Sequence, residues 1–94
     1  MGIHNFKHKG LEQLFVKGSK AGVPTKAATK LGLLLLRLSA AAEAKDLEHP
    51  PGLRLHQLKG ERAGTWSLTV TGNWRMTFRF EGGNAFDVDF EDYH

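Results

Sequence analysis

The first part of the chain spaces its apolar side chains as helices do. Leu11, Leu14 and Phe15 recur at i, i+3 and i+4, which places them on one helical face. This spacing predicts a first helix from about His8. Glycine readily adopts the left-handed conformation that ends many helices, so this helix should stop at Gly18.

A second helix is predicted to run to about Ala42, with Pro24 in its first turn. Its broad apolar stripe consists of Ala27, Ala28, Leu31, Leu34, Leu35, Leu38 and Ala42, and its opposite side carries Lys26, Lys30 and Arg37. Leu33 and Leu36 fall outside this stripe. We therefore expect another element or another chain to cover these two side chains.

The rest of the chain alternates apolar and polar residues with the period of two that is typical of strands. Apolar residues occupy every second position over 66–70 and again over 74–80. A third such strand follows the glycine pair at 82–83, and residues 3–6 (IHNF) predict a short first strand.

The alternation also predicts how the strands pair. A two-residue turn at Gly72 and Asn73 would put the apolar residues of its two strands on opposite faces, because a one-residue slip turns every side chain over. A three-residue loop over 71–73 is therefore predicted instead. Its pairs are Val70 with Trp74, Leu68 with Met76 and Trp66 with Phe78. A turn centred on Gly83 likewise predicts Phe80 with Phe86, Phe78 with Val88 and Met76 with Phe90.

This register gives the sheet one apolar face and one polar face. The polar face is expected to stay open and carries Arg75, Thr77, Arg79, Asp87, Asp89 and Glu91. The predicted architecture is α+β, with two N-terminal helices packed on the apolar face of a small, mostly antiparallel sheet. A chain of 94 residues suffices for one modest core, so we expect a single domain over 1–94.

Composition and charge narrow the compartment and the partner. The chain has no cysteine, so no disulfide supports the fold, which is compatible with a cytoplasmic protein. The longest apolar run, 31–38, is interrupted by Arg37 and too short to span a bilayer, so no membrane partner is expected. Residues 1–62 carry eleven Lys/Arg against five Asp/Glu, whereas 63–94 carry two against five. A basic body suits a polyanion such as RNA, although merely solvated lysines would give the same count.

Several side chains could together cleave RNA through the ribose 2′-hydroxyl. That reaction needs a base, an acid and cations that stabilise the charged phosphorus centre. The candidates are His56, Tyr93 and His94 for proton transfer, Lys59 and Arg75 as cations, and Asp92 to orient a histidine. This route needs no metal, and the histidines lack a diagnostic metal-binding spacing, so neither a metal nor another cofactor is expected.

The same residues allow a purely structural interpretation. A lysine such as Lys59 often protects an edge strand from pairing with other chains. On the polar face, Arg79 should lie opposite Asp87 and Arg75 opposite Glu91, as ordinary cross-strand ion pairs. The last strand, however, runs directly into the end of the sequence. We therefore expect the last three residues to be held against the sheet.

Three stretches carry a resemblance to a known family. FKHKGLEQLFVKG, PPGLRLHQLKGERAGTWSLTVTGNWRMTFRF and VDFEDYH resemble the HigB type of toxin in the RelE/ParE superfamily of bacterial toxin–antitoxin systems. The resemblance implies a RelE/ParE-like fold and a ribosome-dependent endoribonuclease that cuts mRNA in the ribosomal A site and inhibits translation. It also implies a HigA-like helix-turn-helix antitoxin, encoded next to the toxin, through which alone the toxin would reach operator DNA.

The resemblance also implies an active site. Its histidine and lysine in RLHxLKG match His56 and Lys59, and its arginine in GNWR matches Arg75. The terminal DYH matches residues 92–94, that is Asp92, Tyr93 and His94. All six are active-site candidates, without a choice of base or acid.

Two other interpretations of the chain stay open. A toxin of the ParE branch would share the fold and poison DNA gyrase without being a nuclease, and a module that binds RNA or a partner would need no chemistry at all. The clustered proton-transfer groups favour the nuclease. The second helix departs from relatives, which are richer in Lys and Arg where this chain has LGLLLLRL. This departure leaves Leu33 and Leu36 for an antitoxin or a second subunit.

Overall fold

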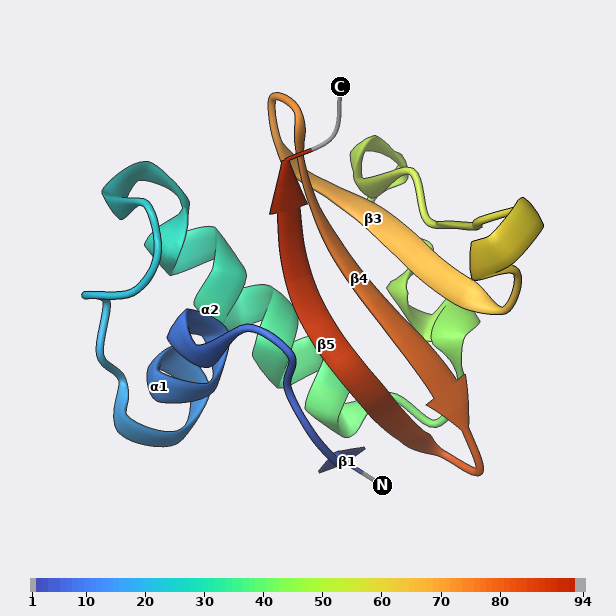
Figure 1. Cartoon of the computed structure of the whole chain (residues 1–94), viewed down its shortest axis with the longest axis horizontal. Coiled ribbons are helices and arrows are strands. Elements are labelled where there is room, and N and C mark those ends of the chain that lie inside the picture. The colour runs from blue at the N-terminus through green and yellow to red at the C-terminus, as the bar shows by residue number, and fades with distance from the viewer. Residues whose placement is uncertain (1, 93–94) are drawn as a thin grey trace.

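Two helices cover one face of a five-stranded sheet in the computed structural model, which describes residues 2–92 (Figure 1). The elements are β1 (Gly2–Ile3), α1 (Lys9–Lys17), α2 (Thr25–Ala40), η1 (Ala44–Leu47), η2 (Pro51–Leu53), β2 (His56–Gln57), η3 (Gly60–Arg62), β3 (Thr65–Thr71), β4 (Trp74–Glu81) and β5 (Asn84–Asp92). The strand order is β1-β5-β4-β3-β2, and only the β1–β5 pairing is parallel. The predicted α+β architecture is confirmed.

Local side-chain contacts decide where the helices begin and end. Nδ1 of His8 accepts a hydrogen bond from the Leu11 N–H at 3.1 Å, which caps α1, and Gly18 ends this helix with a φ of 71°. Pro24 stands immediately before α2 rather than in its first turn. The second helix ends at Ala40, two residues earlier than predicted. The Asp46 carboxylate accepts hydrogen bonds from the N–H groups of residues 42 and 43, which turns the chain there.

The hairpin between β3 and β4 combines a tight turn with a β-bulge. The predicted pairs Leu68–Met76 and Trp66–Phe78 are confirmed. The predicted pair Val70–Trp74 is wrong, because Thr71 pairs with Trp74 and the register shifts between Thr69 and Thr71. The bulge supplies the extra residue that the sequence assigned to a longer loop, so the apolar sets still share one face.

The hairpin between β4 and β5 has a second bulge. Met76 pairs with Phe90 as predicted, but Phe80 pairs with Ala85 instead of Phe86, and the register shifts between Thr77 and Arg79. The predicted pair Phe78–Val88 falls at this bulge. On the other strand Asp87 is left-handed, with a φ of 54°.

The residues after β1 hold this bulge in place. The Asn5 side chain accepts a hydrogen bond from the Asp87 N–H at 3.0 Å and donates one to the Asp87 carboxylate at 2.7 Å. The Asn5 carbonyl also accepts from the Val88 N–H. The predicted strand over residues 3–6 is thus reduced to Gly2–Ile3 and an isolated bridge from Phe6 to Val88.

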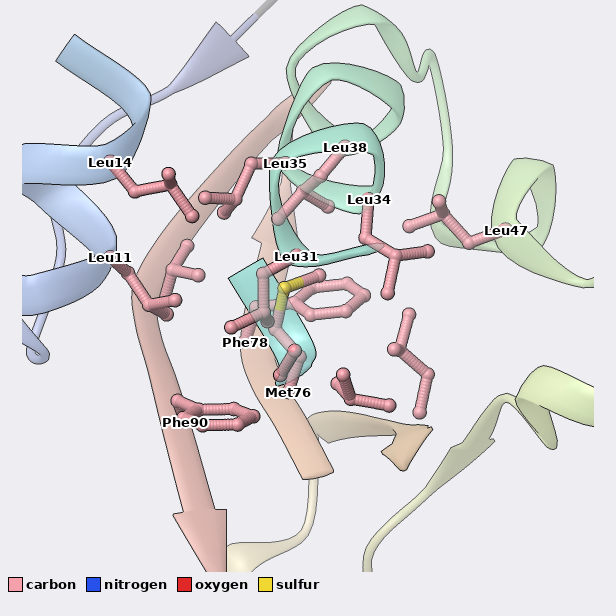
Figure 2. Packing of buried hydrophobic residues seen from close by; sticks show 14 of the residues in the cluster. Leu11, Leu14, Leu31, Leu34, Leu35, Leu38, Leu47, Met76, Phe78 and Phe90 are labelled. Atoms are coloured by element: carbon pink, nitrogen blue, oxygen red, sulfur yellow. The ribbon is translucent and has the colours of Figure 1, made fainter. Parts of the chain in front are cut away.

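The core lies between the helices and the apolar face of the sheet. Leucines of α1 and α2 converge on Met76, Phe78 and Phe90 (Figure 2). Leu33 and Leu36 point elsewhere and are 59% and 60% exposed, so the prediction that another element of the chain covers them is wrong. Within residues 2–92, no helix has the length and apolar character needed to cross a membrane.

The first helix and the loop before α2 meet backbone to backbone at a glycine pair, Gly10 and Gly22. An added Cβ on Gly10 would lie 2.1 Å from the Gly22 carbonyl oxygen, and one on Gly22 would lie 2.6 Å from the Gly10 Cα. Neither backbone atom can move aside as a side chain could. This close approach sets the position of α1 against the loop that leads to α2.

We predict opposite effects for alanine at two helical glycines. Gly10→Ala should lower the free energy of unfolding by about 1–3 kcal/mol, because its methyl group meets the Gly22 backbone. Gly32→Ala, where a Cβ meets nothing within 4 Å, should raise it by about 0.5–1 kcal/mol, because alanine is the better helix former. Urea unfolding of both variants measures this difference. Equal destabilisation would contradict the role of the glycine pair.

Candidate active site

The register of the sheet places His56 on its polar face. His56 lies opposite Ser67, Ser67 opposite Thr77, and Thr77 opposite Asp89. Directly opposed residues of neighbouring strands point to the same face, so this row crosses the sheet from the β2 edge to β5. His56 therefore lies on an edge strand of the sheet.

Arg75 occupies the next row on the same face. It pairs with Thr69 on β3 and with Glu91 on β5, two residues along each strand from the His56 row. Only β3 separates the strands of His56 and Arg75, so their backbones are roughly 10 Å apart across the sheet. The structure therefore brings this histidine and this arginine to one surface.

A backbone carbonyl fixes the orientation of the His56 ring. Nδ1 of His56 lies 2.8 Å from the Arg54 carbonyl oxygen, which can only accept, so Nδ1 carries the proton. Arg54 itself is left-handed, with a φ of 51°, and this conformation turns its carbonyl toward the ring. In the neutral ring Nε2 is then the unprotonated nitrogen, which can take up a proton.

Lys59 lies on a segment that an ion pair ties to the sheet. It is exposed and directly precedes η3, which ends at Arg62. The Arg62 guanidinium donates to both carboxylate oxygens of Glu91, at 2.8 and 2.5 Å. The Thr77 hydroxyl donates to the same carboxylate at 2.5 Å. One carboxylate on β5 thus holds both β4 and the segment that carries Lys59.

This ion pair corrects two predictions about the polar face. Glu91 does pair with Arg75 in the register of the strands, but its ion pair forms with Arg62. The face is also not open at its centre, because Ser67 and Thr77 are only 2% and 4% exposed. At Thr77 the Glu91 carboxylate, with Arg62 bound to it, lies against this face.

Charges are balanced on the part of the polar face that lies away from Arg75. Arg79 binds Asp87 and Glu81, each at 3.0 Å. The predicted Arg79–Asp87 ion pair is thus confirmed, but the predicted register is wrong, because the bulge places Arg79 opposite Phe86. A hollow of about 200 Å³ beside it is lined by both signs of charge: Lys7, Arg62 and Arg79 with Glu61, Asp87 and Asp89. Such a balance offers little attraction to a phosphate.

The C-terminal candidates are placed only in part. Asp92 pairs with Trp74, so the alternation of β4 puts it on the face opposite Arg75. Trp74 stacks on Phe90 on that side, with ring centroids 4.6 Å apart. Tyr93 and His94 lie outside the described residues. The structure thus unites His56 and Arg75 on one face and does not bring Asp92 to it.

Ion pairs shift two carboxylates toward the charged form. The Arg62 hydrogen bonds, together with that of Thr77, hold the pKa of Glu91 below its usual range. The pKa of Asp87 is likewise lowered, first by the Asn5 side chain and then by Arg79. Among residues 2–92, no group of three or more His, Asp or Glu could hold a metal ion.

Arg62 is the residue of the candidate site that the sequence did not reveal. It stands in LKGER, three residues after Lys59, with no local partner that marks it out. Its partner Glu91 is 29 residues away, and the predicted register had assigned Glu91 to Arg75. A comparison of all arginines that could reach Glu91 would have included Arg62, beside Arg75, as a possible ion-pair partner of this carboxylate.

Comparisons with known proteins agree with the fold and cover the candidate residues. A protein-family model described as RelE-like toxin of type II toxin-antitoxin system HigB matches residues 4–94. The chain is 45% identical over 92 residues to Endoribonuclease HigB of Proteus vulgaris, across 98% of this chain and 99% of that protein. It is 32% identical over 84 residues to Toxin HigB-1 of Vibrio cholerae serotype O1, across 88% of each chain.

We predict that Glu91 stabilises the fold in a pH-dependent manner. At pH 7, Glu91→Gln should lower the free energy of unfolding by about 1 kcal/mol. Because the folded chain lowers the pKa of Glu91, its contribution is complete above the unfolded value of about 4.3 and is lost as the pH falls. The two proteins should therefore converge in stability between about pH 5 and pH 3 in urea unfolding. Glu81→Gln, at a far more exposed carboxylate, is the control, and a difference that persists unchanged at pH 3 would contradict this role.

Proposed function

The chain belongs to the HigB-like family of RelE-like toxins of type II toxin–antitoxin systems, and on that basis we propose that it is an endoribonuclease that cuts mRNA in the ribosomal A site. Cleavage of mRNA there would arrest translation in the cytoplasm. The observation that carries the proposal is the shared face of His56 and Arg75, with the His56 ring held by the Arg54 carbonyl.

The proposed reaction is an attack by the ribose 2′-oxygen on the adjacent phosphorus. A base removes the 2′ proton, the new P–O bond forms, and the bond to the 5′ oxygen breaks. An acid protonates that leaving oxygen, so a 2′,3′-cyclic phosphate and a 5′-hydroxyl result. In this scheme His56 exchanges its proton at Nε2, since Nδ1 is occupied by the Arg54 carbonyl.

Two cations would stabilise the charge that develops on phosphorus. Arg75 offers a guanidinium on β4, a shape that matches two phosphate oxygens at once. Lys59 offers a compact charge from the segment between β2 and η3. Fixed positive groups aimed at a transition state are a large part of catalysis, because they need no reorganisation during the reaction. The Arg62–Glu91 pair would keep Lys59 in place for this role.

The second proton-transfer group is assigned to the end of the chain. Tyr93 and His94 follow Asp92 directly in the sequence, and Asp92 pairs with the residue before Arg75. We assign the second proton transfer to this pair. Asp92 would support one of them as an orienting carboxylate and would not contact the substrate, because its strand position faces away from Arg75.

The exposure of the site supports a dependence on the ribosome. His56 and Lys59 are both exposed at the edge of the sheet, where little of the toxin itself would hold a flexible RNA strand. Positioning of the reacting groups can lower a barrier by several kcal/mol, and we propose that the ribosome supplies it. A type II toxin also has an antitoxin partner. We propose that this partner is a HigA-like helix-turn-helix protein, which alone would contact operator DNA.

We predict that three changes to the proposed active site strongly reduce cleavage. Lys59→Ala, His56→Ala and a truncation that lacks His94 should each lower cleavage by about 10²-fold or more, because each removes a cation or a proton-transfer group. Primer extension on a defined mRNA with programmed ribosomes measures the cuts at the A-site codon. Lys45→Ala, at an exposed lysine in η1, should cut normally. Intact mRNA with wild-type protein, while translation or DNA supercoiling still suffers, would overturn the proposal in favour of a same-fold inhibitor.

A second prediction tests whether Arg62 acts by positioning Lys59 or only through its positive charge. Arg62→Ala should lower ribosome-dependent cleavage by about 10-fold or more, because a small misplacement of a catalytic group is costly. Arg79→Ala removes an equally exposed arginine with its own ion pairs on the same face, and should change cleavage by less than about 3-fold. The same primer-extension assay measures both, with thermal unfolding as a check. Equal losses in the two variants would contradict a specific role of Arg62.

A further inference from the structure

An apolar groove runs between the outer surfaces of α1 and α2. It encloses about 380 Å³, and its walls include Phe15 from α1 and Leu33 and Leu36 from α2. Figure 1 shows the two helices side by side against the sheet. The leucines that face the sheet, among them Leu31 and Leu35, do not line this groove (Figure 2), although Leu14 and Ala28 of the core border it.

The two leucines of the groove are the exposed large side chains that the fold leaves unexplained. Leu33 and Leu36 are 59% and 60% exposed, although their neighbours Leu34 and Leu35 are almost fully buried. Large apolar side chains gathered in a hollow on a surface are typical of a binding site for another protein. Val16 is also exposed, at 66%, but it does not line the groove.

A glycine in the wall of the groove, Gly32, also supports a binding site for another protein. Gly32 stands in the middle of α2, where glycine is unfavourable compared with alanine. A Cβ added there would meet nothing within 4 Å, so no contact in the described chain requires a glycine. A glycine leaves room for the backbone of a partner to approach the helix closely.

The positive charge around the groove favours an acidic partner. Residues 9–40 carry six Lys/Arg against a single Glu. Lys20 lines the groove, and Lys26 and Lys30 are exposed on the face of α2 that carries Leu33, seven and three residues before it. A second copy of this chain in a two-fold contact would set this basic rim against itself. A partner with apolar side chains between carboxylates meets no such repulsion.

We propose that the groove binds an amphipathic, acidic segment of the antitoxin. Its apolar side chains would lie against Leu33 and Leu36, its backbone would approach Gly32, and its carboxylates would face Lys20, Lys26 and Lys30. This inference rests on the membership in a type II toxin family and not on the nuclease chemistry. The groove contains none of the proposed catalytic residues.

The experiment measures binding of the full-length chain to the antitoxin encoded by the adjoining gene, by biolayer interferometry. Leu33→Asp and Leu36→Asp should each raise the Kd by about 30-fold or more, as expected for truncation of a central contact residue. Gly32→Leu should do the same by filling the groove. Val16→Asp makes the same change at an equally exposed residue outside the groove, and should leave the Kd within about 3-fold. Lys26→Glu with Lys30→Glu should slow association at low salt and much less at high salt.

Three other results would contradict antitoxin binding at the groove. Unchanged antitoxin affinity of Leu33→Asp and Leu36→Asp would overturn the proposal. A change confined to self-association in sedimentation would instead assign the groove to a second copy, and a change confined to ribosome binding would assign the basic rim to RNA. Each variant is also tested for mRNA cleavage without antitoxin, which should equal that of the wild type. Loss of cleavage by the wild type would affect only the proposed nuclease, because the binding measurement does not depend on it.

Discussion

The bidentate pair between Arg62 and Glu91 joins the parts of this small protein that carry the candidate active site. Glu91 lies opposite Arg75 on β5, accepts from Thr77 on β4, and holds the segment that begins with Lys59. Backbone hydrogen bonds also hold this segment, from the Leu58 N–H to the Thr65 carbonyl at 2.8 Å and from the Ala63 N–H to the Gly60 carbonyl at 3.1 Å, and the ion pair adds a link from it to β5. An isolated surface ion pair stabilises a fold very little, but here it lies over a buried threonine and fixes relative geometry, which matters more for catalysis than its contribution to stability.

A second constraint keeps the polar and apolar faces distinct. Both hairpins use a two-residue turn and a bulge, and each bulge restores the register that the turn alone would disturb. In β5 the bulge needs a left-handed Asp87, and Asn5 binds both its N–H and its carboxylate. The first residues of the chain thus support the face on which His56 and Arg75 meet.

The alternation of apolar residues predicted the helices, the faces of the sheet and the pairs Leu68–Met76 and Met76–Phe90, because burial of one face fixes register strongly. It could not predict the bulges, since a bulge and a longer loop preserve the same pattern. His56, Lys59 and Arg75 were predicted as candidates from their chemistry and from the resemblance to HigB toxins, and the structure places His56 and Arg75 on one face. The Arg54 carbonyl that orients His56 and the pairing of Arg62 with Glu91 depend on backbone conformation and on contacts far apart in sequence. Local sequence patterns therefore could not predict these two contacts.

The two faces of the molecule answer different requirements. In the proposed function the polar face offers charged groups to a substrate, and it tolerates exposure because Lys and His are well solvated there. The helical face exposes Leu33 and Leu36 beside Gly32, which solvation does not favour and which the core does not use. A toxin that is produced with its antitoxin need not leave this surface in water. The exposure of Leu33 and Leu36 beside Gly32 is unfavourable for an isolated chain, and the proposed complex with the antitoxin would account for it.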